Sequence, residues 1–235
     1  MKPSLRPPRT PSNLSDSVFH RLNMYALAAS AAGVGLVALS QPADAKIVYT
    51  STHTQITPNH TIAVDLNHDG KIDFNIKDTW FSTTSVGEDI VGSITVIPAR
   101  KANEIVGYVQ ANFKWGSALA AGVKVGPKTP FSQGTKEMVS GGYDAGTTTV
   151  GWCNGPWKNV QHRYLGLKFT IQGKIHYGWA RLNETCAKNG ENTALLTGYA
   201  YETVPNKAII TGKTKGPDVV TTQATTLSGL ALGRK

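Results

Sequence analysis

One segment of the chain alternates apolar and polar residues so regularly that a β-hairpin is the structure it favours most. Apolar side chains occupy every second position of 165–171, Gln172-Gly173 follows as a two-residue turn, and 174–182 returns. We expect Ile175, Tyr177 and Trp179 to share a face with the apolar residues of the first strand. Leu182 breaks the alternation, so both faces of the return strand are expected to be partly covered.

The rest of the sequence after residue 45 also favours strands. No stretch keeps the i, i+3, i+4, i+7 apolar spacing long enough for a helix. The expected strands are 46–51, 61–65, 72–77, 90–97, 108–113, 147–152 and 194–202. Residues 127–134 should form a long loop, and Gly141-Gly142 a tight turn. The sequence therefore predicts an all-β fold, an antiparallel β-sandwich or jelly roll preceded by an N-terminal signal helix.

The first 45 residues have the order of a signal peptide. Basic residues between Lys2 and Arg21 precede the uncharged run 24–40, and the small residues Ala43 and Ala45 end the segment. We expect cleavage after Ala45 and a secreted or periplasmic protein that begins at Lys46. The alternative is an uncleaved anchor, which would limit membrane contact to this segment, but the run is short for a span that needs about 20 residues.

The remainder divides into a domain and a tail. Residues 46–210 are expected to form one β-sandwich domain, a length sufficient for a sizeable core. Apolar periodicity is lost after Val204-Pro205-Asn206, so 211–235 is expected to be a flexible C-terminal tail.

Basic residues outnumber acidic ones by 24 to 15, and the excess is uneven. Between Trp157 and Lys188 only Glu184 is acidic, whereas six residues are basic: Lys158, Arg163, Lys168, Lys174, Arg181 and Lys188. A positive face there would attract polyanions. For an exported protein the expected partners are an acidic polysaccharide, lipid head groups or another extracellular protein, and not nucleic acid. The alternative is a solvated face that only keeps the protein soluble.

The chain has two cysteines, Cys153 and Cys186. An even pair in an exported protein is typically a disulfide, which would stabilise the fold by about 3 to 4 kcal/mol in the chain-entropy model. No C-x-x-C spacing or neighbouring base favours a zinc site or a nucleophilic cysteine.

The segment DLNHDGKIDF, 65–74, has the spacing of a calcium loop. Oxygen-bearing side chains stand at relative positions 1, 3, 5 and 9, and a glycine at position 6 permits a sharp turn. The expected ligands are the side chains of Asp65, Asn67, Asp69 and Asp73 with the carbonyl of Lys71. Three carboxylates suit the hard cation Ca²⁺ better than a transition metal, because the one softer group, His68, is expected to point outward.

This loop is not an EF-hand, because position 12 is Ile76 instead of a bidentate glutamate and the flanking residues favour strands. A metal in such a strand-loop-strand arrangement is expected to be structural. The alternative is a metal-free turn, since Asp, Asn and Gly also favour turns through side-chain hydrogen bonds to the backbone.

Signals for ligand binding and catalysis are weaker. Trp157 and Trp179 are candidates for stacking on sugar rings, although aromatic residues also favour strands and cores. His162 and His176 have no nucleophile elbow beside them, and Glu88-Asp89 with Glu184 is a glycosidase pair that sequence cannot place. We therefore expect no catalytic residues.

Four segments resemble exported bacterial proteins of the PEP-CTERM kind, including those of acidobacteria. They are the 65–74 loop, RYLGLKF at 163–169, HYGWARL at 176–182 and GYAYE at 198–202. The resemblance implies an exported β-sandwich with a strand-loop-strand calcium site. The apolar run within 226–235 is far too short for the family's C-terminal sorting helix, which favours free secretion or the periplasm.

These patterns together predict an exported, non-enzymatic β-sandwich with a structural calcium loop, acting in binding or in an extracellular matrix. The alternative is a carbohydrate-binding module or a carbohydrate-active enzyme.

Overall fold

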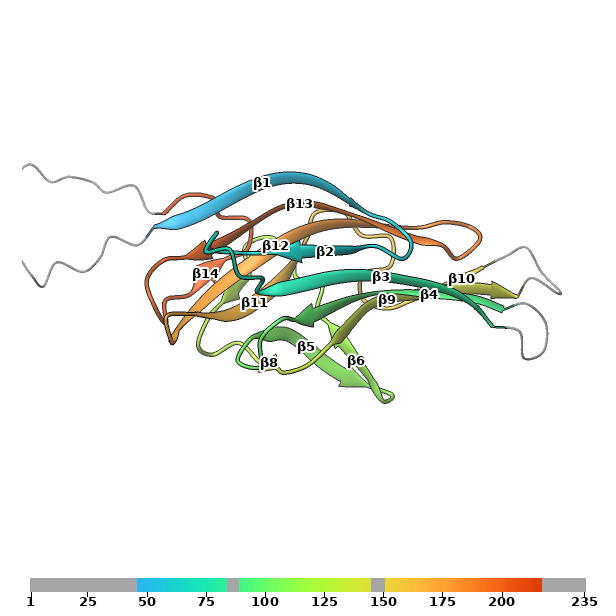
Figure 1. The fold of residues 1–235 in the computed structure, drawn as a ribbon, viewed down its shortest axis with the longest axis horizontal. Coiled ribbons are helices and arrows are strands. Elements are labelled where there is room, and N and C mark those ends of the chain that lie inside the picture. Colours follow the sequence, from blue (N-terminus) through green and yellow to red (C-terminus); the bar gives the residue numbers. More distant parts are fainter. Residues whose placement is uncertain (1–45, 84–88, 145–150, 217–235) are drawn as a thin grey trace, which may run out of the picture. The chain divides into compact units, whose positions relative to one another are not determined.

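The described part of the chain consists of strands, turns and loops. The computed structural model describes residues 46–83, 89–144 and 151–216. The expected all-β class is confirmed, since these residues contain fourteen strands and no helix (Figure 1). The expected signal segment, 1–45, lies outside the described residues.

The strands vary in length from two to thirteen residues. In chain order they are β1 (Ile47–Ile56), β2 (Thr61–Val64), β3 (Phe74–Thr83), β4 (Asp89–Pro98), β5 (Glu104–Gln110), β6 (Phe113–Gly116), β7 (Lys124–Val125), β8 (Phe131–Ser132), β9 (Lys136–Asp144), β10 (Trp152–Asn154), β11 (Arg163–Ile171), β12 (Lys174–Cys186), β13 (Asn192–Glu202) and β14 (Ile209–Ile210).

Twelve of these strands form a single mixed sheet in the order β1-β13-β12-β11-β5-β6-β9-β4-β3-β2, with β8 added to β5 and β10 added to β9. Its pairs are antiparallel except for β6 with β9, which meet in parallel at Trp115 and Glu137. The remaining two strands form the ribbon β14-β7. The expectation of two separate antiparallel sheets is thus not confirmed: β5 continues one half of the sheet into the other, and the sheet curves toward a barrel.

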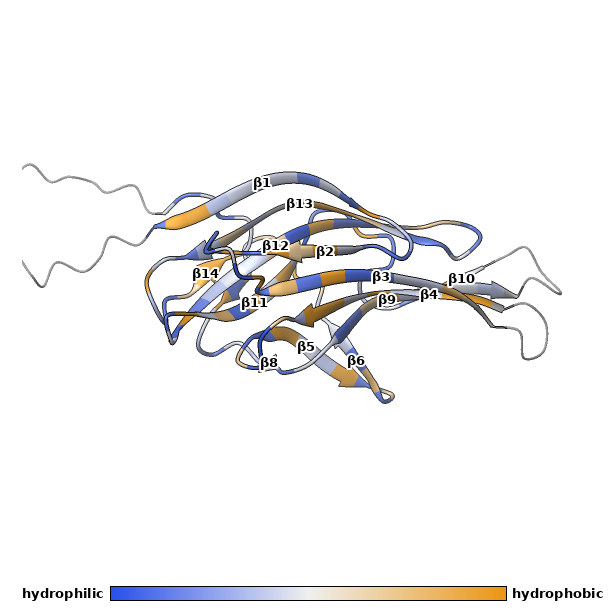
Figure 2. Ribbon diagram, in the orientation of Figure 1, coloured by the Kyte–Doolittle hydropathy of each residue, from blue (hydrophilic) through white to orange (hydrophobic). Residues whose placement is uncertain are grey.

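The main core lies between the two halves of this curved sheet. Side chains from both halves pack into one buried cluster, which includes Phe74 and Ile94 from one half and Leu167 and Leu182 from the other. At the start of β3, over 74–77, hydrophobic and hydrophilic residues alternate (Figure 2), as expected for a strand with one buried face. Burial of each large apolar side chain stabilises the fold by about 1.5 to 3 kcal/mol.

The hairpin β11–β12 forms as predicted, but the facing of β12 was predicted wrongly. Gln172 and Gly173 both have positive φ, 49° and 77°, which is typical of a two-residue hairpin turn. Such a turn sets Ile171 opposite Lys174, so Leu167 lies opposite Gly178. Residues that lie opposite each other share a face. Ile175, Tyr177 and Trp179 therefore lie on the face opposite to the first strand's apolar residues.

An outer layer covers this second face of β12. Tyr177 and Trp179 pack with Val125 of β7 and Ile209 of β14 in a separate buried cluster. The central part of β12 is consequently buried on both sides, as the broken alternation at Leu182 indicated. The layer also includes Thr211, which was expected to begin a flexible tail. Thr211 is buried, and its Oγ1 donates to the carbonyl oxygen of Ala120 at 2.7 Å, so the folded domain extends past residue 210.

Two glycines expected to form a turn lie instead inside the long strand β9. Gly141 and Gly142 pair with Gly92 and Val91 of β4. A Cβ atom on Gly141 would collide with the carbonyl oxygen of Gly190, and one on Gly142 with that of Ile90. Glycine is required there because backbones approach closely, and not because the chain reverses direction.

Candidate metal site

The predicted calcium loop connects the ends of two paired strands. β2 ends at Val64 and β3 begins at Phe74, which lies opposite it, and the Asp73 N–H donates to the Val64 carbonyl at 2.9 Å. Leu66 is fully buried and anchors the loop in the main core. Gly70 has a φ of 79° with open space around its Cα, so its backbone conformation is what requires glycine.

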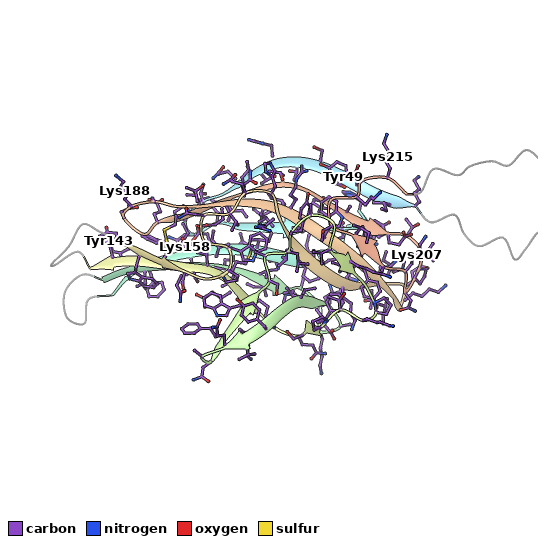
Figure 3. The ribbon with its side chains drawn as sticks, turned by 180° about the vertical axis from the view of Figure 1, so that it is seen from behind. Tyr49, Tyr143, Lys158, Lys188, Lys207 and Lys215 are labelled. Atoms are coloured by element: carbon purple, nitrogen blue, oxygen red, sulfur yellow. A yellow bond between two sulfur atoms is a disulfide. The ribbon has the colours of Figure 1, made fainter. Side chains whose placement is uncertain are left out.

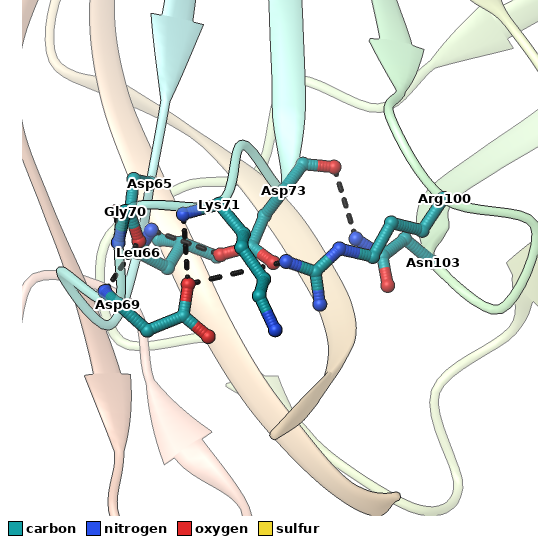
Figure 4. A network of polar contacts seen from close by, with 8 residues as sticks. All are labelled: Asp65, Leu66, Asp69, Gly70, Lys71, Asp73, Arg100 and Asn103. Carbon is teal, nitrogen blue, oxygen red and sulfur yellow. Dashed lines mark hydrogen bonds and ion pairs between the residues drawn. The ribbon is translucent and has the colours of Figure 1, made fainter. Parts of the chain in front are cut away.

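The aspartates of the loop hold its backbone (Figure 4). The Asp65 carboxylate accepts from the N–H groups of Asp69 at 3.3 Å and Gly70 at 2.8 Å. Asp69 Oδ1 accepts from Lys71 N–H at 2.9 Å, and Asp73 Oδ2 accepts from Leu66 N–H at 3.0 Å. These are the side-chain-to-backbone bonds of a self-supporting turn, and they leave Oδ2 of Asp69 and Oδ1 of Asp73 without a bond to the loop backbone.

One oxygen of the loop is left without any partner. Asn67 Oδ1 is buried and accepts no hydrogen bond from the part of the chain that the structure describes. A buried acceptor without a donor costs about 1 to 3 kcal/mol. A bound cation is one group that could satisfy this oxygen.

The carboxylates of the loop differ in their electrostatic surroundings. Burial raises the pKa of Asp73 to about 6, an effect opposed by the Leu66 N–H and by Arg100 and increased by Asp65 and Asp69. The pKa of the exposed Asp69 is lowered, chiefly by the side chain of Asn67, with the Lys71 N–H and Arg100 also contributing.

A turn distant in sequence braces the loop, and sequence analysis did not single it out. Arg100 Nη2 lies 3.9 Å from Asp69 Oδ1 and has no hydrogen-bond partner in the described residues. The carbonyl of Asp73 accepts from Asn103 Nδ2 and from Ala99 N–H, both at 2.9 Å. The pairing of Phe74 with Pro98 places this turn beside the loop, and the spacing of residues within either segment does not indicate such a contact.

Two other loop residues also have defined positions. His68, expected to point out of the loop, bonds through Nε2 to Thr50 Oγ1 of β1 at 2.7 Å. Lys71 is exposed. Among the described residues, no group of three or more His, Cys, Asp or Glu side chains is arranged to hold a metal ion. A site here would therefore need Asn67 and backbone oxygens beside the carboxylates.

The predicted disulfide is confirmed. Cys153 of β10 and Cys186 at the end of β12 are bonded, with their Cα atoms 6.4 Å apart. The bond joins a short strand added to one half of the sheet to the longest strand of the other half.

The two tryptophans considered as sugar platforms are core residues in this structure. Trp157 and Trp179 are both 0% exposed. Trp157 Nε1 donates to the Gly116 carbonyl at 2.8 Å, and Trp179 packs edge-on against Tyr164 with ring centroids 5.1 Å apart. Neither ring offers a face to a ligand, so the alternative that such aromatic residues fill the core applies to both.

The acidic residues weighed as a catalytic pair do not form an open site. Glu184 is buried, accepts from the Asn159 N–H at 2.6 Å, and has its pKa raised to about 7 chiefly by burial. Asp89 lies on β4, and Glu88 lies outside the described residues. A second buried carboxyl is Asp78 of β3. Neither of its oxygens has a partner in the described part, and burial, with Glu191 adding, raises its pKa to about 7.

The basic stretch of 157–188 does not form one face. Lys174 begins β12 and Lys188 follows its far end, so the thirteen residues of that strand separate them. Lys158 and Lys188 lie beside the disulfide, at the end of the domain opposite to Lys207 (Figure 3). Lys168 pairs with Glu104 at 2.9 Å, and Arg181 donates to Thr197 Oγ1 at 2.7 Å.

Comparisons do not assign the chain to a family: no family model, no curated protein and no solved structure matches it. The resemblance to PEP-CTERM proteins accordingly stays a prediction. Within the described residues there is no helix of the length and apolarity needed to cross a membrane.

Proposed function

We propose that this chain is an exported, non-enzymatic β-protein whose 65–73 loop binds one structural Ca²⁺ ion, and that it acts by binding or within an extracellular matrix. The curved sheet would serve as a sandwich-like scaffold with its two halves around one core. The observation that carries the calcium proposal is the buried, unpartnered Oδ1 of Asn67 within a loop of three aspartates.

The loop offers the oxygen ligands that Ca²⁺ prefers. Asp65, Asn67, Asp69 and Asp73 would contribute side-chain oxygens, and Lys71 its carbonyl. The ion would bind the unpartnered Oδ1 of Asn67 and offset the mutual repulsion of the three carboxylates. Without it, their ion pair in the described residues is that of Asp69 with Arg100. Calcium supplies charge and a fixed coordination shell, and the chain supplies the turn.

A structural role follows from where the loop lies. β2 has four residues and is the last strand on its end of the sheet, so among the strands that the structure describes it pairs with β3 alone. A short edge strand is held by few hydrogen bonds and frays readily. A cation that fixes the loop between β2 and β3 would therefore stabilise this edge.

Calorimetry with calcium and with a chelator tests the proposal. At calcium concentrations about 100-fold above the dissociation constant, the Tm should rise by about 5 °C or more over the chelated protein. Asp69→Asn should lose most of this rise, whereas Glu137→Gln, a carboxyl change on β9, should keep it. Equal Tm values with and without calcium for the unaltered protein would overturn the proposal.

A second candidate function, carbohydrate binding, is favoured by one surface feature. Tyr108 and Phe113 of the β5–β6 hairpin are 42% and 48% exposed and share a face of it, because Tyr108 pairs with Trp115 and Gln110 with Phe113. Together with Asn154 they line a cavity of about 370 Å³. Aromatic faces beside amide groups suit a sugar ring. Saturable binding of a neutral oligosaccharide that is lost in Tyr108→Ala, and kept in Tyr143→Ala, the same change at a half-buried tyrosine of β9, would support this function.

A further inference from the structure

A lysine-lined cavity lies beside the outer ribbon β14-β7, and none of its lining residues belongs to the calcium loop. Its volume is about 560 Å³, within the range of small-ligand sites. Three lysines line it, Lys124 of β7, Lys128 and Lys207, together with Pro127, Asn206 and Ala208. Nothing in the sequence singled out this group, because its members come from two segments about 80 residues apart.

The walls of this cavity are held by backbone bonds and close packing. Thr129 Oγ1 accepts from the Gly126 N–H at 2.9 Å and donates to the Lys124 carbonyl at 3.3 Å. A Cβ on Gly126 would collide with Ala208, so the two lining segments are in close contact there. On the other wall, the Asn206 N–H donates to the Ile175 carbonyl of β12 at 2.9 Å. The cavity is therefore formed before any ligand arrives.

The charge of the cavity is positive. Lys207 Nζ lies 3.9 Å from Glu202 Oε2, a carboxylate whose side chain is 3% exposed and so cannot reach a ligand. Lys124 and Lys128 have no ion pair among the described residues, and none of the lining residues is acidic. Two uncompensated ammonium groups beside one hollow favour an anionic ligand.

We propose that this lysine-lined cavity binds an acidic polysaccharide through the carboxylate or sulfate groups of its sugar units. The hollow can hold a sugar ring against Pro127 and Ala208 while the lysines reach its anionic group. The site is a hollow of about 560 Å³ and not a flat surface, so it suits a single sugar unit that enters it better than a layer of lipid headgroups. The inference names a partner for the binding role proposed above and rests on that role, but it does not depend on the calcium loop.

Binding assays on the purified full chain with polygalacturonate, in the presence of a calcium chelator, test the site. Polygalacturonate should bind and dextran should not, and binding should weaken as salt is raised. The double variant Lys124→Gln/Lys128→Gln should lose at least tenfold in affinity. The matched control Lys158→Gln/Lys188→Gln, which removes the same charge at the opposite end, should bind as the unaltered protein does, with the Tm of all three proteins equal.

Four results would overturn the proposal. The first three are absence of binding to polygalacturonate, equal binding of dextran, and an equal loss of affinity in the control variant. The fourth is a protein that does not bind polygalacturonate but binds vesicles of anionic lipid, with the vesicle binding lost in Lys124→Gln/Lys128→Gln. The last would make the cavity a lipid headgroup site. Because calcium is chelated throughout, failure of the metal proposal leaves these outcomes unchanged, and failure here leaves the calorimetric test unchanged.

Discussion

Arg100 Nη2 lies 3.9 Å from Asp69 Oδ1, so a guanidinium group reaches the acidic loop from the turn that follows β4. If the loop binds calcium as proposed, the Arg100 guanidinium competes with the ion, because both are cations attracted by the carboxylate of Asp69. Repulsion between the Arg100 guanidinium and an ion bound beside Asp69 is worth about 1 kcal/mol in water.

Arg100→Gln should therefore bind calcium about fivefold more tightly than the unaltered protein, by isothermal titration. Lys101→Gln, the neighbouring exposed cation in the same turn, is the control and should change the affinity much less. An affinity that falls in Arg100→Gln would show that the arginine supports the loop instead of competing with its ion.

The buried Asp78 should make the domain less stable as the pH rises. Its folded pKa is about 7, against an ordinary value of 3.8, so the native state binds the proton more tightly. Because the folded state holds this proton more tightly than the unfolded state, the free energy of unfolding falls as the pH rises between about 4 and 7. Asp78→Asn should raise the free energy of unfolding by about 1 kcal/mol or more at pH 8 and change it little at pH 4, as measured by denaturant titration. A variant equally destabilised at both values would contradict this account.

Loss of the disulfide should weaken the domain without unfolding it at room temperature. Cys153 and Cys186 are 33 residues apart in sequence, so opening the bond should cost about 3 to 4 kcal/mol in the chain-entropy model. Cys153→Ser/Cys186→Ser should show this loss in urea unfolding. The unaltered protein under reducing conditions should match the double variant, and a reductant should not affect the variant.

Two strand glycines should respond differently to the same substitution. Gly141→Ala places a Cβ against the Gly190 carbonyl and should cost about 2 kcal/mol or more. In Gly116→Ala the nearest atom to the new Cβ is 3.4 Å away, so its stability should change by less than about 1 kcal/mol. Thermal melts of the two variants compare their stabilities directly. Equal losses of stability would contradict the close approach of the Gly190 backbone as the reason why position 141 requires glycine.

Local patterns predicted what depends on local chemistry. The alternation of 165–171 gave β11, the Gln172-Gly173 turn gave the hairpin, and the spacing of Asp65 to Asp73 gave a closed loop between two strands. The cysteine pair also followed, because only one pairing exists.

Long-range geometry escaped prediction for identifiable reasons. Which side chains of β12 share a face with the apolar residues of β11 depends on the residues that the two-residue turn sets opposite each other. Because β12 has apolar residues on both of its faces, the alternation of its sequence alone does not show which face lies against the main core. The contact of Arg100 with Asp69 needs the β3–β4 pairing, and the cavity lysines need the ribbon β14-β7. Glycine in β9 was interpreted as a turn because the sequence does not show which backbone lies beside it.

The pairing of β1 with β13 sets the order in which the large sheet can be completed. Ile47 lies opposite Glu202 and Ile56 opposite Ala194, so the first strand is partnered by the last long one. Contacts this distant in sequence form late, because the intervening chain must be brought together first. In a chain synthesised from its N-terminus, β1 cannot pair fully until β13, Asn192–Glu202, has been made. The domain therefore completes its fold only when nearly all of it has emerged.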